Sequence, residues 1–513
     1  MKKNYVKYTA VFLLGLGAFS SCKKSFLETT PKGEFAETNY YQTPAEAFAG
    51  LVAAYGPLTT ETGGLDGTYT DPLGPLNAAS DDCVSGGGGS SDTPDLQAAN
   101  NYTELTSTQG PQAGFWPINF LGISSANIIL SKLGSVPGLS TALKNQYTGE
   151  ALFLRAYYYF NLVRLFGNVP LITQPLVPAD IYNQPQVKAA TTYAQIEADL
   201  TAAIPNLPVT IPASEDGRVT QGAAVALLGK VYLYEKKWTQ AAAELALVNG
   251  TTPGQASATY GYKLLTNFAS IFDPNNKFNS ESIWELARTA SGNYTWNNWD
   301  QFKSNIYVQF VGPRNYAGPV YSGGYGFNPI TLGLVAAYKT PYYGGTTKDP
   351  RYGYTMYDMD SLVLAQNSSY QASYENTGYF IQKYAPLTKF LSPTGTNILN
   401  FPNDYIEIRL ADTYLMEAEA LVNAGTNTAR AQALMDAVRA RVGLASVPVT
   451  LTNLKAERRL ELATEGHRWY DLVRWGDAPT ALASKGFTAG KNEVFPIPLS
   501  ELSNTKLVQN PGY

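Results

Sequence analysis

One segment near the C-terminus, residues 457–476, constrains the fold of this chain more than any other. Only 15% of the 513 residues are charged, yet eight of the twenty in this run (ERRLELATEGHRWYDLVRWG) are. Opposite charges recur three residues apart, a spacing that places them face to face on a helix. The pairs with this spacing are Arg458–Glu461, Glu465–Arg468, Arg468–Asp471 and Asp471–Arg474. We predict a helix whose charges neutralise one another, bent or broken at Gly466 and ended by Gly476.

The same segment also suggests acid–base chemistry, because three glutamates would stack on one face beside His467, the only histidine of the chain. These glutamates are Glu457, Glu461 and Glu465. An apolar stripe at Leu462, Trp469, Leu472 and Val473 favours a different interpretation. Charges buried with such a stripe must be paired, and the arginines of the segment supply partners. We therefore predict that the segment builds the core and is not an active site.

This segment and two others resemble the SusD/RagB family, nutrient-binding outer-membrane lipoproteins of Bacteroidetes. Residues 150–170 (EALFLRAYYYFNLVRLFGNVP) are similar to an early helix of the family and the turn after it, and residues 495–513 are similar to its closing segment. The three matches follow the family's order along the chain. The resemblance implies a mainly α-helical fold, a SusD-like scaffold of degenerate TPR-type helix pairs that carries a large loop-rich insertion.

Helical periodicity in the chain agrees with such a scaffold. Thr43-Pro44-Ala45-Glu46 has the pattern of a helix start, and this helix should run to Tyr55. Further helices are predicted over residues 116–133, 143–165, 191–204, 222–234, 238–248, 405–422 and 428–442. Two of them contain the Leu-(Gly/Ala)-x-x-Tyr core of a TPR helix, beginning at Leu228 and Leu410. A helix pair cannot bury its apolar face alone, so we expect the pairs to stack.

The N-terminus has the pattern of an export signal. Lysines at positions 2, 3 and 7 precede a short apolar run, and Ser20-Ser21-Cys22 resembles a lipobox. We predict a signal peptide over residues 1–21 and lipidation of Cys22, which would anchor the chain at the outer membrane, with the cell surface as the expected side. An ordinary cleaved signal is the alternative, and Lys23 and Lys24 leave the side of the membrane open.

The rest of the chain, residues 22–513, is expected to form one SusD-like domain. Its parts are a helical scaffold over about 40–250 and 401–480, a loop-rich insertion over about 255–400 and a closing segment over 491–513. A Gly- and Ser-rich loop is predicted over residues 56–114, and loops of this length in compact proteins are usually functional.

Aromatic residues are concentrated in the insertion. From residue 294 to 343, 13 of 50 residues are Phe, Trp or Tyr, about twice the 12% of the whole chain. Rings on Gly- and Pro-rich loops have less core to enter, and flat rings next to asparagines suit the C–H faces and hydroxyls of sugars. The candidate ligand-binding residues are Trp296, Trp299, Tyr316, Tyr321 and Tyr325. The alternative is that these rings pack into a satellite core of their own.

The resemblance also implies where the ligand binds and which partner the protein has. Ligand contacts in the family come from the loop after the first helix and from the later insertion, here residues 56–114 and roughly 275–345. Asp81 and Asp82 lie where similar proteins have a polar pair near the site, and Tyr102 is the best aromatic residue of the first loop. That loop contains no Trp, so the sugar is not identified. The resemblance implies delivery of oligosaccharide or polysaccharide nutrients to a SusC-like TonB-dependent transporter; a peptide nutrient is the alternative.

Composition argues against several other functions. The chain has two cysteines, Cys22 and Cys83, and processing of Cys22 would leave no disulfide framework. One histidine makes a metal site or a Ser–His mechanism improbable, and a formal charge of −4 does not favour nucleic acid. We predict no metal, no cofactor and no catalysis. The alternatives are a glycosidase with two carboxylates from Asp81, Asp300, Asp349 and Asp358, or a pure TPR-type interaction scaffold.

Overall fold

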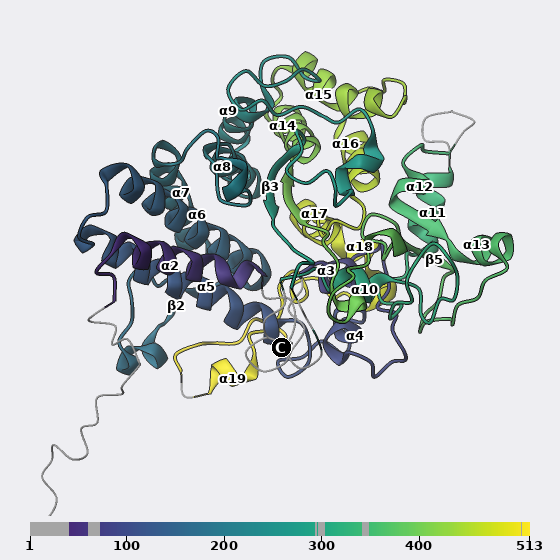
Figure 1. The fold of residues 1–513 in the computed structure, drawn as a ribbon, viewed down its shortest axis with the longest axis horizontal. Coiled ribbons are helices and arrows are strands. Elements are labelled where there is room, and N and C mark those ends of the chain that lie inside the picture. The colour runs from purple at the N-terminus through teal and green to yellow at the C-terminus, as the bar shows by residue number, and fades with distance from the viewer. Residues whose placement is uncertain (1–39, 60–71, 293–294, 296–302, 341–347, 504) are drawn as a thin grey trace, which may run out of the picture.

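The computed structural model of the protein describes residues 40–59, 72–292, 295, 303–340, 348–503 and 505–513. The fold is mainly α-helical, as predicted. Long helices from the first half of the chain and from residues 410–462 form one array, and the segments between them carry short helices and strands (Figure 1).

The first part of the array contains six long helices, each packed against the next in the chain. They are α2 (Pro44–Tyr55), α5 (Gln112–Lys132), α6 (Thr141–Phe166), α7 (Ala189–Ala203), α8 (Gln221–Tyr234) and α9 (Trp238–Asn249). The predicted start of α2 is confirmed. The Glu46 N–H donates to Thr43 Oγ1 at 3.3 Å, and the Thr43 N–H donates to the Glu46 carboxylate at 3.0 Å, which forms a capping box.

Helix α5 and the turn after it, Gln112–Ser135, are long and apolar enough to cross a membrane by length and composition. Half of their most apolar stretch is buried inside the fold, and α5 packs against both α2 and α6. A core helix of a folded domain passes the same test, so we describe α5 as part of the scaffold.

The second part of the array contains α14 (Leu410–Ala424) and α15 (Thr428–Arg441). Helix α14 packs against α9, so the two predicted TPR-like pairs stack. Helices α8 and α9 approach each other closely at Gly229, where a Cβ atom would lie 2.6 Å from Leu245 Cγ. This close approach explains the glycine of the Leu228-Gly229-x-x-Tyr232 motif.

The remaining α-helices have at most eight residues, apart from α16 (Leu451–Leu462), which has 12. They are α3 (Leu73–Ala79), α4 (Pro94–Asn100), α10 (Tyr307–Val311), α11 (Leu332–Lys339), α12 (Tyr352–Thr355), α13 (Met359–Gln366), α16 (Leu451–Leu462), α17 (Arg468–Trp475), α18 (Ala478–Ala481) and α19 (Leu499–Leu502). In the loop predicted over 56–114, the described residues therefore include helices α3 and α4 and the start of α5. Helices as short as α3 and α4 lack the repeated apolar positions by which longer ones are recognised.

Strands of the described residues form three two-stranded antiparallel sheets. They pair β1 (Val169–Pro170) with β2 (Gln186–Val187), β3 (Ser282–Leu286) with β6 (Tyr405–Arg409), and β4 (Met356–Asp358) with β5 (Tyr379–Ile381). The helix predicted over 405–422 is wrong in its first five residues. All five are buried in β6, because pairing with β3 and burial of Ile406 and Ile408 outweigh helical periodicity there.

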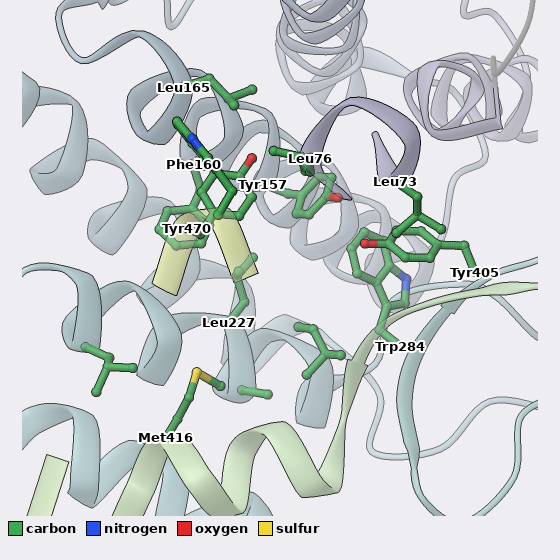
Figure 2. Close-up of a cluster of buried hydrophobic side chains, with 14 of the residues drawn as sticks. Leu73, Leu76, Tyr157, Phe160, Leu165, Leu227, Trp284, Tyr405, Met416 and Tyr470 are labelled. Carbon is green, nitrogen blue, oxygen red and sulfur yellow. The ribbon is translucent and has the colours of Figure 1, made fainter. Parts of the chain in front are cut away.

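One core joins the scaffold, the first loop and the insertion (Figure 2). Trp284 of β3 meets Phe153 and Tyr157 of α6 edge to face, with ring centroids 4.9 and 5.0 Å apart. Leu73 of α3 and Tyr405 of β6 belong to the same cluster. The loop segments that flank the helices are therefore packed onto them, which gives a ligand site on those segments a rigid support.

The charged segment 457–476 is buried, and its helix is broken as predicted. Helix α16 ends at Leu462 and α17 begins at Arg468, with Gly466 between them at a φ of +79°. Gly476 ends α17 in the left-handed conformation, also as predicted. Positive φ is costly for any residue with a Cβ atom, which explains why glycines mark both points.

Three of the four ion pairs that the spacing predicts are not found among the described residues. Only Asp471–Arg474, at 2.7 Å, is found among the ion pairs of the described residues. The others are Arg458 with Asp412 and Asp471, Glu461 with Arg351, Arg409 and Arg441, Glu465 with Lys383 and Arg409, and Arg468 with Asp81. The break separates only Glu465 from Arg468; Arg458 and Glu461 share α16, and Arg468 and Asp471 share α17, yet in each pair both residues bond to other partners instead. Because every one of these charges is paired, the structural interpretation of the segment is confirmed.

His467 gives the protein a predictable response to acid. Burial, together with the nearby charge of Lys230, outweighs the attraction of Asp412 and lowers the pKa of His467 to about 4. The unfolded chain takes up this proton near pH 6.5, so stability is retained above that pH and lost as pH falls toward 4. Between pH 7 and pH 5 the free energy of unfolding of the wild type should fall by about 2 kcal/mol more than that of His467→Gln, measured by urea unfolding. Equal losses in the two proteins would contradict this assignment.

Candidate functional site

Asp81 and Asp82 connect the first loop to the charged segment. The Asp81 carboxylate pairs with Arg468 at 2.7 Å and with Arg459 at 3.0 Å, and Asp82 pairs with Arg459 at 2.8 Å. Burial raises the pKa of Asp82, which is fully buried, while the pKa of Asp81 is lowered because Arg468 and Arg459 outweigh burial. These contacts give both residues a structural role that the prediction of a ligand-binding pair did not foresee.

Tyr102 lies in the core, contrary to the expectation of an available ring. Its side chain is 1% exposed, and its hydroxyl donates to the Ala79 carbonyl at 2.6 Å. The ring packs edge to face on Phe487 at 5.0 Å. A ligand cannot stack on a ring that neighbouring side chains cover, so we do not include Tyr102 in the site.

The three tyrosines predicted from the insertion do not form one platform. Tyr316 and Tyr321 are buried in a separate cluster with Tyr357, where the rings of Tyr321 and Tyr357 stack at 4.4 Å. For these two residues the satellite core is what the structure contains. Tyr325 is half-buried, with its ring against Phe310 at 5.5 Å. Outside the described residues lie Trp296, Trp299, Asp300 and the predicted lipidation residue Cys22.

The two segments expected to carry the site meet through Arg288. Its Nη1 donates to the Thr59 carbonyl at 2.7 Å and its Nη2 to the Leu58 carbonyl at 3.2 Å. The next residue, Thr289, donates its N–H to the Lys303 carbonyl at 2.7 Å. Residues 289 and 303, which flank Trp296 and Trp299 in the sequence, are thus bonded to each other. Arg288 links this pair to residues 58 and 59 of the first loop.

Arg288 is itself held in place by buried charges. Its N–H donates to Asp404 Oδ1 at 2.7 Å, and Lys277 Nζ bridges the Arg288 carbonyl and the same carboxylate oxygen, both at 2.7 Å. Burial raises the pKa of Glu285 to about 8, and the adjacent Asp404 carboxylate adds to the rise. The sequence carries no signal for this cluster, because its members lie far apart in the chain and match no motif.

Polar groups surround this meeting point. The hydroxyls of Thr289 and Ser291 lie 2.7 Å apart on exposed residues, and Ser392 Oγ donates to the Ala290 carbonyl at 2.9 Å. Burial lowers the pKa of Lys303, an ammonium next to Arg288 that points toward the Thr59 hydroxyl at 3.5 Å. Hydroxyls both donate and accept hydrogen bonds and an ammonium group donates them, and a neutral polyhydroxylated ligand can use both kinds of partner.

A cavity of about 90 Å³ lies below the meeting point. Its lining includes Leu58, Arg288, Asn305, Glu407 and His467. Ligand pockets have volumes of roughly 300–1,000 Å³, so this cavity is too small for an oligosaccharide. A glycan site at this place must therefore lie on the outer surface of the loops.

A helical array of TPR-type pairs that carries a loop-rich insertion defines the class of fold, and comparison with known proteins gives the family. A SusD family model matches residues 280–491, and a model described as starch-binding associating with outer membrane matches residues 78–233. A laminarin binding SusD-like protein of known structure is 47% identical, covers 92% of this chain and 100% of its own, and has a TM-score of 0.86. The chain belongs to the SusD family.

Two further relatives extend this comparison. Surface glycan-binding protein A from Bacteroides fluxus is 27% identical, covering 92% of this chain and all of its own, with a TM-score of 0.80. SusD-like protein P25 of Formosa agariphila is 26% identical over 96% of this chain and 97% of its own length. These relatives span nearly the whole chain, so scaffold, first loop and insertion all have counterparts in them.

Proposed function

We propose that the protein binds oligosaccharides of the laminarin type without cleaving them. The observation that carries this proposal is the 47% identity to a laminarin-binding relative, which extends over 92% of the chain and includes the segments that meet at Arg288. The proposed site lies over that meeting point. We propose that Trp296 and Trp299 stack on sugar rings, and that the hydroxyls of Thr289 and Ser291 and the Lys303 ammonium bond sugar hydroxyls.

The proposed function is capture and release. Delivery to a transporter requires fast dissociation, so the expected affinity is micromolar or weaker, about −8 kcal/mol or less in magnitude. We infer that Cys22 carries the lipid that anchors the protein at the outer membrane and that a SusC-like TonB-dependent transporter is the partner. The family description of outer-membrane association supports this location.

The proposal includes no catalytic step. Two of the four carboxylates considered for a glycosidase have structural partners: Asp349 pairs with Arg351 at 2.7 Å, and Asp358 Oδ1 accepts the Ser361 N–H at 3.0 Å. A third, Asp81, is paired with two arginines. A hydrolase of this kind needs two carboxyl groups about 5–10 Å apart, and the partners of these three side chains support a structural role for them instead.

A glycan array with the mature chain tests the proposal. We expect laminarin oligosaccharides to be bound and to change Trp fluorescence, with no reducing ends released on long incubation. The release of reducing ends would identify an enzyme instead. Binding of peptides but of no glycan on the array would contradict the proposed ligand class.

A further inference from the structure

A second pocket, larger than the cavity at Arg288, lies in the insertion and is lined only by residues that the structure describes. Its volume is about 210 Å³. The walls come from the turn that ends at Asp273, from α12, from the segment after β5 and from the segment before β6. The side chains used below are Phe272, Asp273, Tyr354, Gln382, Lys389 and Asn403. Because ligand pockets for larger molecules begin at roughly 300 Å³, a pocket of this size accepts one ring and not a chain.

Two aromatic rings face this pocket. Tyr354 is 45% exposed, and its ring leans on the buried Phe268 at 6.2 Å. Phe272 is half-buried and packs edge to face on Tyr384 at 5.8 Å. Rings fixed from behind in this way keep their free faces in position, and a flat apolar face suits the C–H face of a sugar ring.

The polar groups of the pocket are of both hydrogen-bonding kinds. Asn403 is 5% exposed and forms part of the wall; its Oδ1 is sealed inside the fold, so we assign it no ligand contact. Asp273 adds a carboxylate and Lys389 an ammonium, while Gln382 is oriented by the Tyr321 hydroxyl, which donates to its Oε1 at 2.8 Å.

This mixture selects the class of ligand. A second lysine of the lining, Lys383, is paired with Glu465 at 2.6 Å, which leaves one carboxylate, Asp273, opposite one ammonium, Lys389. Charges of both signs favour no single ionic ligand, whereas each sugar hydroxyl both donates and accepts hydrogen bonds. Two contacts also bring the pocket close to the proposed glycan site: the Asn403 carbonyl accepts from Asn305 Nδ2 at 3.0 Å, and the segment after Lys389 reaches Ala290 through Ser392 at 2.9 Å.

We propose that this pocket binds one hexopyranose ring of the captured glycan, as a subsite next to the main platform; this inference rests on the proposed function. Its test uses two opposite changes. Tyr354→Ala removes the exposed ring. Gly353→Leu adds bulk at a residue that lines the pocket, where a Cβ atom would have no other atom within 4 Å and therefore no clash. Tyr182→Ala, at a ring 62% exposed on another surface, is the matched control.

Affinity for laminarihexaose is measured by calorimetry, and the reactivity of Tyr354 by hydroxyl-radical footprinting with mass spectrometry. We expect each pocket variant to bind about five- to tenfold more weakly, Tyr182→Ala to bind like the wild type, and Tyr354 to be protected at saturation. Full reactivity of Tyr354 at saturation overturns the subsite, whatever the variants do. Unchanged affinity in both pocket variants would also overturn the subsite. Failure of the wild type to bind laminarihexaose would instead count against the proposed function. The wild-type measurement comes first, so the two kinds of failure are distinguished before any variant is compared.

Discussion

Replacing Glu461 with Gln is expected to lower the free energy of unfolding by about 3–5 kcal/mol. The Glu461 side chain is 0% exposed, and its carboxylate pairs with Arg351, Arg409 and Arg441. Burial alone would raise the pKa of Glu461, but these three charges outweigh it and hold the pKa well below its usual range. The amide keeps the shape of the side chain and removes its charge, so three buried guanidinium groups lose a shared partner.

An exposed ion pair of the same region provides the control. Lys455 and Asp477 pair at 2.6 Å with side chains 30% and 43% exposed. Solvent screens such pairs, and we expect Asp477→Asn to change stability by less than about 1 kcal/mol. Urea unfolding at pH 7 measures both variants. A loss for Glu461→Gln as small as that of the control would mean that the network contributes no more than a surface pair.

This network shows which parts of the fold the sequence could predict. The capping box of Thr43 and Glu46 and the stops at Gly466 and Gly476 are predictable, because a few adjacent residues determine them. The partners of Glu461 could not be predicted in the same way. Its arginines come from three other segments, and only the fold decides that burial of one carboxylate is matched by all of them.

The candidate site, too, was predictable only in part. Composition indicates that the insertion is rich in aromatic rings, but composition does not distinguish a ring that lines a surface from one that faces a neighbour, and Tyr316 and Tyr321 are buried. The resemblance indicates the two segments involved. Arg288, which joins them, escapes prediction because the acceptors by which it does so, on Leu58 and Thr59, are backbone carbonyls, and any residue can supply a carbonyl.

Replacing Trp296 and Trp299 together with Ala is expected to abolish measurable laminarihexaose binding while leaving Tm nearly unchanged. Each stacking contact contributes about 1.5 kcal/mol at most beyond the area it buries, so the loss of two costs about 3 kcal/mol. That is about a hundredfold in Kd and moves a micromolar complex out of the measurable range. Calorimetry and thermal unfolding on the same samples test both parts of the prediction.

Trp475→Ala is the matched control, because it removes a tryptophan of known structural role. Its Nε1 donates to Glu419 at 2.8 Å on the α14–α17 side of the scaffold. This variant should lose stability and keep its affinity, the reverse of the double variant. If the double variant instead melts much earlier, the two indoles belong to the core and the satellite-core alternative holds for them too. If it melts normally and still binds, the glycan is held by other residues, and a platform built on these two rings is wrong.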